Sequence, residues 1–246
     1  MATTRTTFGN PAYEGPAGTV SAAQATTPAR MAFLRKTYSL FSMAMVLWMG
    51  TAAAVISSES LTQSIGNIFF GSWIGIVGYL LGAFVLLRVT AKKFPLNVIG
   101  LGLFAVFMGG FTAPLVGYYL EIPGGGGIVL QAFVLTLAVF GALTGYVLVT
   151  KKDFSFMRGA LAIGLGLAIG LAILAAFGAS FAVGIVSGTG WSIAMVLLFG
   201  GYMLYDTSNI LHRYPANMAA TAAAMLFYDF VIMFIHMLRL VAASRD

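Results

Sequence analysis

Long apolar stretches separated by short polar breaks fill the chain from about residue 37 to its end. About 20 consecutive apolar residues are what an α-helix needs to cross the hydrocarbon core of a bilayer. Helices are favoured because a bilayer offers no water to unpaired backbone groups. The pattern predicts an all-α membrane protein with seven transmembrane helices, at residues 37–57, 67–88, 96–120, 127–149, 158–178, 186–211 and 220–242.

The composition agrees with a membrane domain. Of the 246 residues, 60% are hydrophobic and only 8% are charged, whereas soluble domains carry about 25% charged residues. The absence of cysteine excludes disulfides and thiolate metal sites. The net charge of +6 would suit nucleic acid, but no aromatic and basic platform on a soluble domain accompanies it. We therefore expect no nucleic-acid partner.

The first part of the chain is rich in Thr, Ala, Pro and Gly and contains no apolar run like that of a secretory signal. Arg5 and Arg30 are its only basic residues before position 31, and its prolines and glycines disfavour an amphipathic helix. These features favour a disordered tail over the alternative, a mitochondrial transit peptide. We expect a disordered cytoplasmic N-terminal tail at 1–36, a transmembrane domain at 37–242 and a short tail at 243–246.

Positive charges are unevenly divided between the two sides that the predicted helices define. With the N-terminus in the cytoplasm, eleven of the 13 Lys and Arg residues fall in cytoplasmic segments. Only Arg239 and Arg245 fall on the other side. Lys and Arg mark cytoplasmic loops, and a missed helix would scramble this alternation. The pattern predicts a cytoplasmic N-terminus and an external C-terminus.

Two carboxylic acids lie within predicted spans, Asp206 and Asp229, each preceded by a tyrosine. An ionised carboxylate at the centre of a membrane helix costs about 2.5–3.5 kcal/mol, so such a residue indicates a functional site by default. The two residues belong to consecutive helices joined by a short turn. An antiparallel hairpin places them at similar depth, roughly 10 Å from the cytoplasmic end at about 1.5 Å per residue.

Two carboxyl groups in one site can hold a single shared proton. The proton would join the two helices, and its loss would make them repel each other. The alternative is that each Asp bonds a backbone group or a tyrosine hydroxyl and only stabilises the fold. The matched depth favours the pair, because two independent structural acids need not coincide.

Three segments resemble the Bax-inhibitor-motif family of membrane proteins. LYDTSNILHRYP followed by FYDFVIMFIHMLRL resembles the last two helices of that family. LTGYVLVTKKDFSFMRGAL resembles its junction between the fourth and fifth helices, and RKTYSLFS resembles the start of its first helix. The similarity covers about residues 33–242. It implies seven helices, with six surrounding a central C-terminal helix.

Bacterial members of the family are associated with a pH-dependent calcium leak, in which an aspartyl pair on the last two helices closes the pore on the cytoplasmic side. Carried over, the resemblance implies that Asp206 and Asp229 are the gate and pH sensor. Arg88 stands where leak-type relatives carry an arginine that engages the pair. The second predicted span contains no acid, whereas those relatives carry a Glu there, and a calcium path needs several oxygen ligands.

We therefore expect a proton-gated cation leak channel, for calcium, in the bacterial inner (plasma) membrane. Its partners would be the lipid bilayer and cations, with calcium as a transient occupant and no cofactor. A mitochondrial inner membrane is the alternative location. The alternative function is a non-conducting membrane subunit that modulates a membrane protease or stabilises a larger membrane complex.

Tyr205, Tyr228 and His236 are candidate supporting residues. His236 lies seven residues after Asp229 on the same helix face, where it would extend a proton path or bond a neighbouring helix. Asp153 stands where the N-cap of the fifth span belongs. No pair of His residues has metal-ligand spacing, so we predict no metal site.

Three further patterns bear on packing and activity. The glycines of the fifth span form a GxxxG pair, Gly166 and Gly170, which favours packing within the monomer over dimerisation. A retinal protein needs a Lys on the last helix, where none occurs. An intramembrane aspartyl protease would use two aspartates, but its Gly-x-Gly-Asp motif is missing. We predict no enzymatic activity.

Overall fold

The structure is a computed structural model that describes residues 26–70, 73–91 and 93–245. These residues form helices and turns, with no strand among them. The order is α1 (Thr27–Ile56), α2 (Glu59–Phe70), α3 (Trp73–Thr90), α4 (Leu96–Glu121), α5 (Gly125–Thr150), the 3₁₀ turn η2 (Ser155–Met157), α6 (Arg158–Ala176), α7 (Ser180–Ser187), α8 (Thr189–His212) and α9 (Ala219–Ala243).

Five of the described helices are long and apolar enough to cross a membrane. They are α1, α4, α5, α6 with η2, and α9. The pair α7 and α8 adds a sixth candidate, bent by 68° at Gly188. Only a shorter apolar segment, Val77–Thr90, is found in α3. The chain is therefore an all-α, multi-pass membrane protein.

Several predicted boundaries differ from the structure. The first helix begins at Thr27, ten residues before the expected span, with a proline in its first turn. Residues 27–36 thus belong to a helix and not to the tail, while residues 1–25 lie outside the described part of the chain. Proline starts helices well, because its fixed φ suits the first turn and its missing N–H is not needed there.

The predicted span 67–88 is divided between two helices, since α2 ends at Phe70 and α3 begins at Trp73. Residues 59–66, expected as an outer loop, are helical as part of α2. The sixth predicted span also differs, because α7 precedes the bend at Gly188 and α8 follows it.

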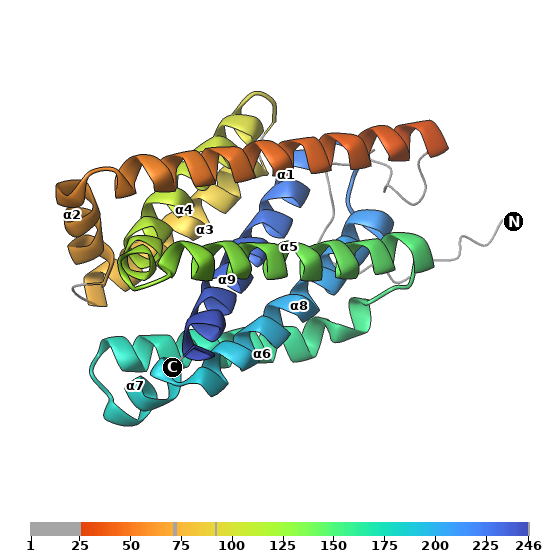
Figure 1. The fold of residues 1–246 in the computed structure, drawn as a ribbon. Coiled ribbons are helices and arrows are strands. Elements are labelled where there is room, and N and C mark those ends of the chain that lie inside the picture. The colour runs from red at the N-terminus through yellow and green to blue at the C-terminus, as the bar shows by residue number, and fades with distance from the viewer. Residues whose placement is uncertain (1–25, 71–72, 92, 246) are drawn as a thin grey trace, which may run out of the picture.

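Helix α9 lies at the centre of the packing. It contacts α1, α3, α4, α5 and α8, and Figure 1 shows it in dark blue crossing the middle of the fold. In its apolar segment 67% of the residues are buried, against 11% for α6. Small residues at its start, Ala219 to Ala224, let neighbouring backbones approach. Helix α6 lies at the edge of the bundle.

Aromatic side chains fill the space around α9. Trp48 of α1 packs edge-on against Phe227, Phe230 and Phe234 of α9, with ring centroids 5.4–6.4 Å apart. The indole N–H of Trp48 donates to Thr112 Oγ1 of α4 at 2.9 Å. Trp48 therefore joins three helices, and its own indole N–H is paired in the core.

The closest helix approach is not at the predicted GxxxG pair. A Cβ placed on Gly166 or Gly170 would meet no atom within 4 Å, so no described residue of another helix packs closely against this pair. The prediction of intramolecular packing there is wrong. A Cβ on Gly109 of α4 would instead lie 2.7 Å from the carbonyl oxygen of Trp48, so Gly109 is where α1 and α4 meet most closely.

The basic residues gather at one end of the bundle, which we call the basic end. Thr221 at the start of α9 donates to the Thr90 carbonyl at the end of α3, at 2.9 Å, and so brings two of these segments together. At the opposite end Arg245 donates to Gln131 of α5 at 3.0 Å. The described basic residues at the helix ends and connections of the basic end are Arg30, Arg35, Lys36, Arg88, Lys93, Lys151, Lys152, Arg158 and Arg213.

Candidate functional site

The two acids singled out in the sequence lie together in the structure. Asp206 of α8 and Asp229 of α9 face each other, with their carboxyl groups within hydrogen-bonding reach. Asp229 is buried, with 3% of its surface exposed, and Asp206 is partly buried. The contact follows from the hairpin of α8 and α9, whose short turn sets both residues at one depth.

A hydrogen bond between two carboxyl groups requires a proton, because an ionised carboxylate can only accept. No Lys, Arg or His contacts either group among the described residues. The Asp229 Oδ2 atom is buried without a hydrogen-bond partner. A buried charge with no partner is very costly. The pair must therefore be neutralised by a proton or by a bound cation.

Tyrosines surround the pair. Tyr202, one turn before Asp206 on α8, donates its hydroxyl to the Leu161 carbonyl at 3.0 Å. Its phenol also lies within electrostatic range of both carboxyl groups. Sequence reasoning missed Tyr202, although its position four residues before Asp206 places it on the same helix face. It links the pair to α6.

Two tyrosines had been predicted as supporting residues. Tyr205 lies beside Tyr202. The ring of Tyr228 packs near Phe104 and Phe199, and its hydroxyl approaches that of Tyr79 on α3. Tyr228 therefore connects the last helix to α3 instead of bonding the acids directly.

Arg88 does not reach the acid pair. Its guanidinium carbon lies 4.7 Å from the centre of the Phe84 ring, one turn earlier on α3, and it forms no ion pair among the described residues. His236 is buried, and its Nδ1 lies 3.5 Å from Ser192 Oγ on α8. That contact corresponds to the alternative in which this histidine bonds a neighbouring helix.

A chain of polar contacts leads from the acid pair to the surface. The side chain of Asn209, one turn further along α8, lies beside the Asp206 carboxyl group. Arg213 donates from Nη1 to Asn209 Oδ1 at 3.2 Å and from Nη2 to Asp153 Oδ2 at 2.8 Å. We call this series, Asp229–Asp206–Asn209–Arg213–Asp153, the polar chain. It ends on the segment between α5 and α6.

A second set of contacts holds that segment to α8. Phe154 N–H donates to Ser208 Oγ at 2.9 Å, and Ser208 donates to the Lys152 carbonyl at 3.3 Å. Sequence reasoning did not identify Ser208, Asn209 or Arg213 as site residues. Asn209 and Arg213 follow Asp206 by three and seven residues and so share one α8 face with it, which is the signal that could have found them. Ser208 lies two residues after Asp206, on another face, and had no such signal.

Asp153 has a different role from the predicted helix cap. Its Oδ1 accepts the Ser155 N–H at 2.9 Å, whereas the N-cap of α6 is Met157, with no side-chain capping bond. Partial burial alone would raise the pKa of Asp153, but hydrogen bonds from Ser155 and the charge of Arg213 lower it below its ordinary value. Asp153 is therefore an ionised partner for Arg213 at neutral pH.

The described residues contain no group of three or more His, Cys, Asp or Glu that could hold a metal ion. Calcium takes six to eight oxygen ligands, and the acid pair with Asn209 provides only a part of such a set. The geometry therefore permits passing contact with a cation and not a closed metal site.

Comparison with known proteins identifies the family. The family model described as "Inhibitor of apoptosis-promoting Bax1" matches residues 30–246, most of the chain. The chain belongs to the Bax inhibitor family. The matched range includes the acid pair and every residue of the polar chain.

Curated relatives agree with this assignment. This Bax inhibitor family protein is 31% identical to the Golgi anti-apoptotic protein of Vaccinia virus (strain Lister), over 92% of the chain and 91% of that protein. It is 32% identical to Protein lifeguard 4 of Mus musculus, over 90% of the chain and 89% of that protein. It is also 31% identical to an uncharacterized protein of Campylobacter jejuni, over 87% of the chain and 89% of that protein. The family predicted from the sequence is thus confirmed.

Proposed function

We propose that the protein is a proton-gated cation leak channel, with calcium as its cation and the Asp206–Asp229 pair as its gate. The observation that carries the proposal is the close approach of two carboxyl groups, one buried and one partly buried, from neighbouring helices without a basic partner among the described residues. A structural role for either acid would not require the other at the same place. Carboxyl groups that are buried in a membrane helix without a basic partner are also common at functional sites.

The gate would work through the proton that the two carboxyl groups share. With one proton between them, α8 and α9 are held together near the basic end. When that proton is lost, two negative charges face each other in a site of low dielectric, where their repulsion is strong. The helices then separate and a cation can enter, with the carboxylates and the Asn209 carbonyl as its oxygen contacts.

The proposed topology follows from the segregation of charge. The basic end would face the cytoplasm, because Lys and Arg accumulate there. Seven crossings result if α3 counts as one crossing and α7 with α8 as another, and α9 would then be the central helix among six. We place the protein in the bacterial plasma membrane, as its bacterial relatives favour, with an external C-terminus.

Calcium flux into proteoliposomes containing only this protein, measured over a pH series, tests the gate. We expect flux to rise with pH in the wild type and to lose most of its pH dependence in Asp206→Asn and in Asp229→Asn. The double variant should add little to either, because groups that act as one unit are not additive. A matched control is Glu59→Gln, which removes an exposed carboxylate of α2 that belongs to neither the acid pair nor the polar chain. Wild-type pH profiles in both single variants would overturn the proposal.

A second candidate is the non-conducting subunit, which modulates a membrane protease or stabilises a larger complex. The observation that favours it is the open face of α6 at Gly166 and Gly170, where an added Cβ would meet no atom of the described chain within 4 Å. Extraction in mild detergent would then recover the protein in stoichiometric complex with a larger assembly, and the isolated protein would give no flux at any pH. Robust flux from the isolated protein would exclude this candidate as a full explanation.

A further inference from the structure

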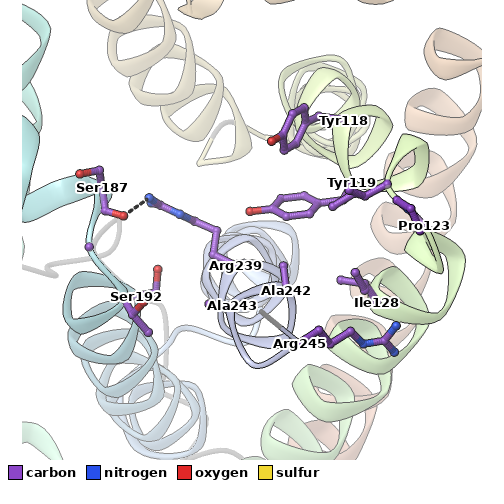
Figure 2. Close-up of a pocket in the computed structure, with 13 residues that line it drawn as sticks. Tyr118, Tyr119, Pro123, Ile128, Ser187, Ser192, Arg239, Ala242, Ala243 and Arg245 are labelled. Atoms are coloured by element: carbon purple, nitrogen blue, oxygen red, sulfur yellow. Dashed lines mark hydrogen bonds between the residues drawn. The ribbon is translucent and has the colours of Figure 1, made fainter.

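The two basic residues that the charge pattern leaves at the opposite end, Arg239 and Arg245, line one cavity. The cavity measures about 590 Å³ and lies among the ends of α4, α5, α8 and α9. Figure 2 shows both arginines around it, together with Tyr118, Tyr119 and Ser187. Pockets that bind small molecules commonly measure about 300–1,000 Å³.

Within the described part of the chain, both guanidinium groups bond to neutral acceptors. Arg239 donates from Nη2 to the carbonyl oxygens of Val186 and Ser187, at 3.0 and 3.3 Å. Arg245 donates to Gln131 Oε1 at 3.0 Å and to the Gly124 carbonyl at 3.5 Å. Neither forms an ion pair among the described residues. Each guanidinium has five N–H donors, so donors and two positive charges remain for a ligand.

The rest of the wall adds neutral donors. The Tyr119 side chain points toward Arg239 across the cavity in Figure 2. Thr189 and Ser192 contribute hydroxyl groups from the first turns of α8. Helix α8 also begins at the cavity, with Gly188 as an N-cap that provides no side-chain bond. Its first N–H groups and the positive end of its dipole favour an anion there.

We propose that this cavity binds a phosphate-type oxyanion, supplied either as free phosphate or as the headgroup of an anionic lipid. Guanidinium groups match the oxygens of phosphate in charge and in planar, two-donor geometry. The position at one end of the bundle suits both sources, since it is where solvent and headgroups meet. Apolar walls suit the carbon atoms beside a headgroup phosphate, and they are formed by Ile122, Pro123, Ile128, Ala242 and Ala243.

No residue that lines the cavity belongs to the acid pair or to the polar chain. Arg239 also bonds the carbonyl groups at the end of α7, so its replacement could disturb the fold as well as the ligand. Arg245 is exposed and offers the cleaner variant. Arg158 is an exposed arginine at the basic end, and Arg158→Gln is the matched control for loss of one charge.

The test has two arms, both with the full-length chain in nanodiscs. In the first, inorganic phosphate is titrated against chloride at constant ionic strength in phosphatidylcholine discs, and binding is measured by calorimetry. In the second, discs contain phosphatidylcholine with or without phosphatidylglycerol, and retained lipid is counted by native mass spectrometry. Binding in the first arm alone identifies free phosphate as the source, and selective retention of phosphatidylglycerol identifies a lipid headgroup.

We expect Arg245→Gln and Arg239→Gln to weaken binding about tenfold or more, since each removes a charge-assisted contact. Arg158→Gln should bind as the wild type does. If Arg239→Gln does not fold, the binding affinity of Arg245→Gln tests the proposal alone. The proposal is overturned if the wild type binds neither phosphate nor phosphatidylglycerol, or if Arg245→Gln binds with wild-type affinity.

Discussion

Arg213 Nη2 lies 2.8 Å from Asp153 Oδ2, and this ion pair joins the end of α8 to the segment between α5 and α6. The same guanidinium donates to Asn209 Oδ1, and the Asn209 side chain lies beside the Asp206 carboxyl group. A partly exposed ion pair at the basic end is therefore connected to a buried acid pair through one amide. Each link can be tested separately.

The Arg213–Asp153 ion pair should make a small contribution to stability that depends on pH. Its side chains are 40% and 49% exposed, so a double-mutant cycle with Asp153→Asn and Arg213→Gln should give a coupling of about 0.2–1 kcal/mol at pH 7. The folded-state pKa of Asp153 is lowered from 3.8. The coupling is therefore present above that value and lost as pH falls through the folded pKa. Thermal unfolding in detergent between neutral and strongly acidic pH measures it, and a coupling that persisted in strong acid would contradict this assignment.

Asn209 should matter more than an asparagine elsewhere, because it is the only amide of the polar chain. Asn209→Ala removes the amide group that lies beside the Asp206 carboxyl group. It also removes the Oδ1 atom that accepts from Arg213. We expect a loss of about 1–3 kcal/mol in the free energy of unfolding, typical of leaving buried polar groups unsatisfied. Asn67→Ala, at an exposed position of α2, is the control and should change stability by less than about 0.5 kcal/mol. Equal losses in the two variants would show that Asn209 is not a link.

Gly109 and its neighbour Gly110 offer a test of the contact between α1 and α4. A Cβ at Gly109 would lie 2.7 Å from the Trp48 carbonyl oxygen and from Thr51 Cβ, whereas one at Gly110 would meet nothing within 4 Å. Gly109→Ala should lower the free energy of unfolding by about 1–3 kcal/mol through overpacking. Gly110→Ala should leave it unchanged or raise it slightly, because Ala favours helix. The midpoint of thermal unfolding in detergent distinguishes the two.

Topology can be tested with fused reporters. A reporter placed after Asp246 should be active outside the cytoplasm, and one inserted near Lys152 should be active inside, if the basic end is cytoplasmic. Activity of both reporters on one side would exclude an odd number of crossings between them.

The long helices were predictable because bilayer thickness sets a length that the sequence must match with apolar residues. The predicted spans 96–120, 127–149 and 220–242 lie within three residues of α4, α5 and α9. Helices α2 and α7 were missed for the same reason, since 12 and 8 residues are too short to stand out from a neighbouring apolar run. The division after Phe70 and the bend at Gly188 depend on tertiary packing.

The acid pair was predictable because a carboxylate within a span is costly. Asn209 and Tyr202 were missed, since neutral polar side chains carry no comparable penalty and do not stand out in composition. Arg88 was expected at the pair on the basis of its position along a helix. That position gives depth but not the direction in which the side chain points, and Arg88 lies over Phe84 instead.

The candidate span with the largest buried share, α9, is also synthesised after every other helix described here. While the ribosome is still making the chain, Trp48 of α1 and Phe140 of α5 have no α9 rings to pack against. The earlier helices must therefore enter the membrane before their common partner exists, and long-range contacts form late. Core assembly waits for α9 to be made, and Asp206 meets Asp229 in that same step.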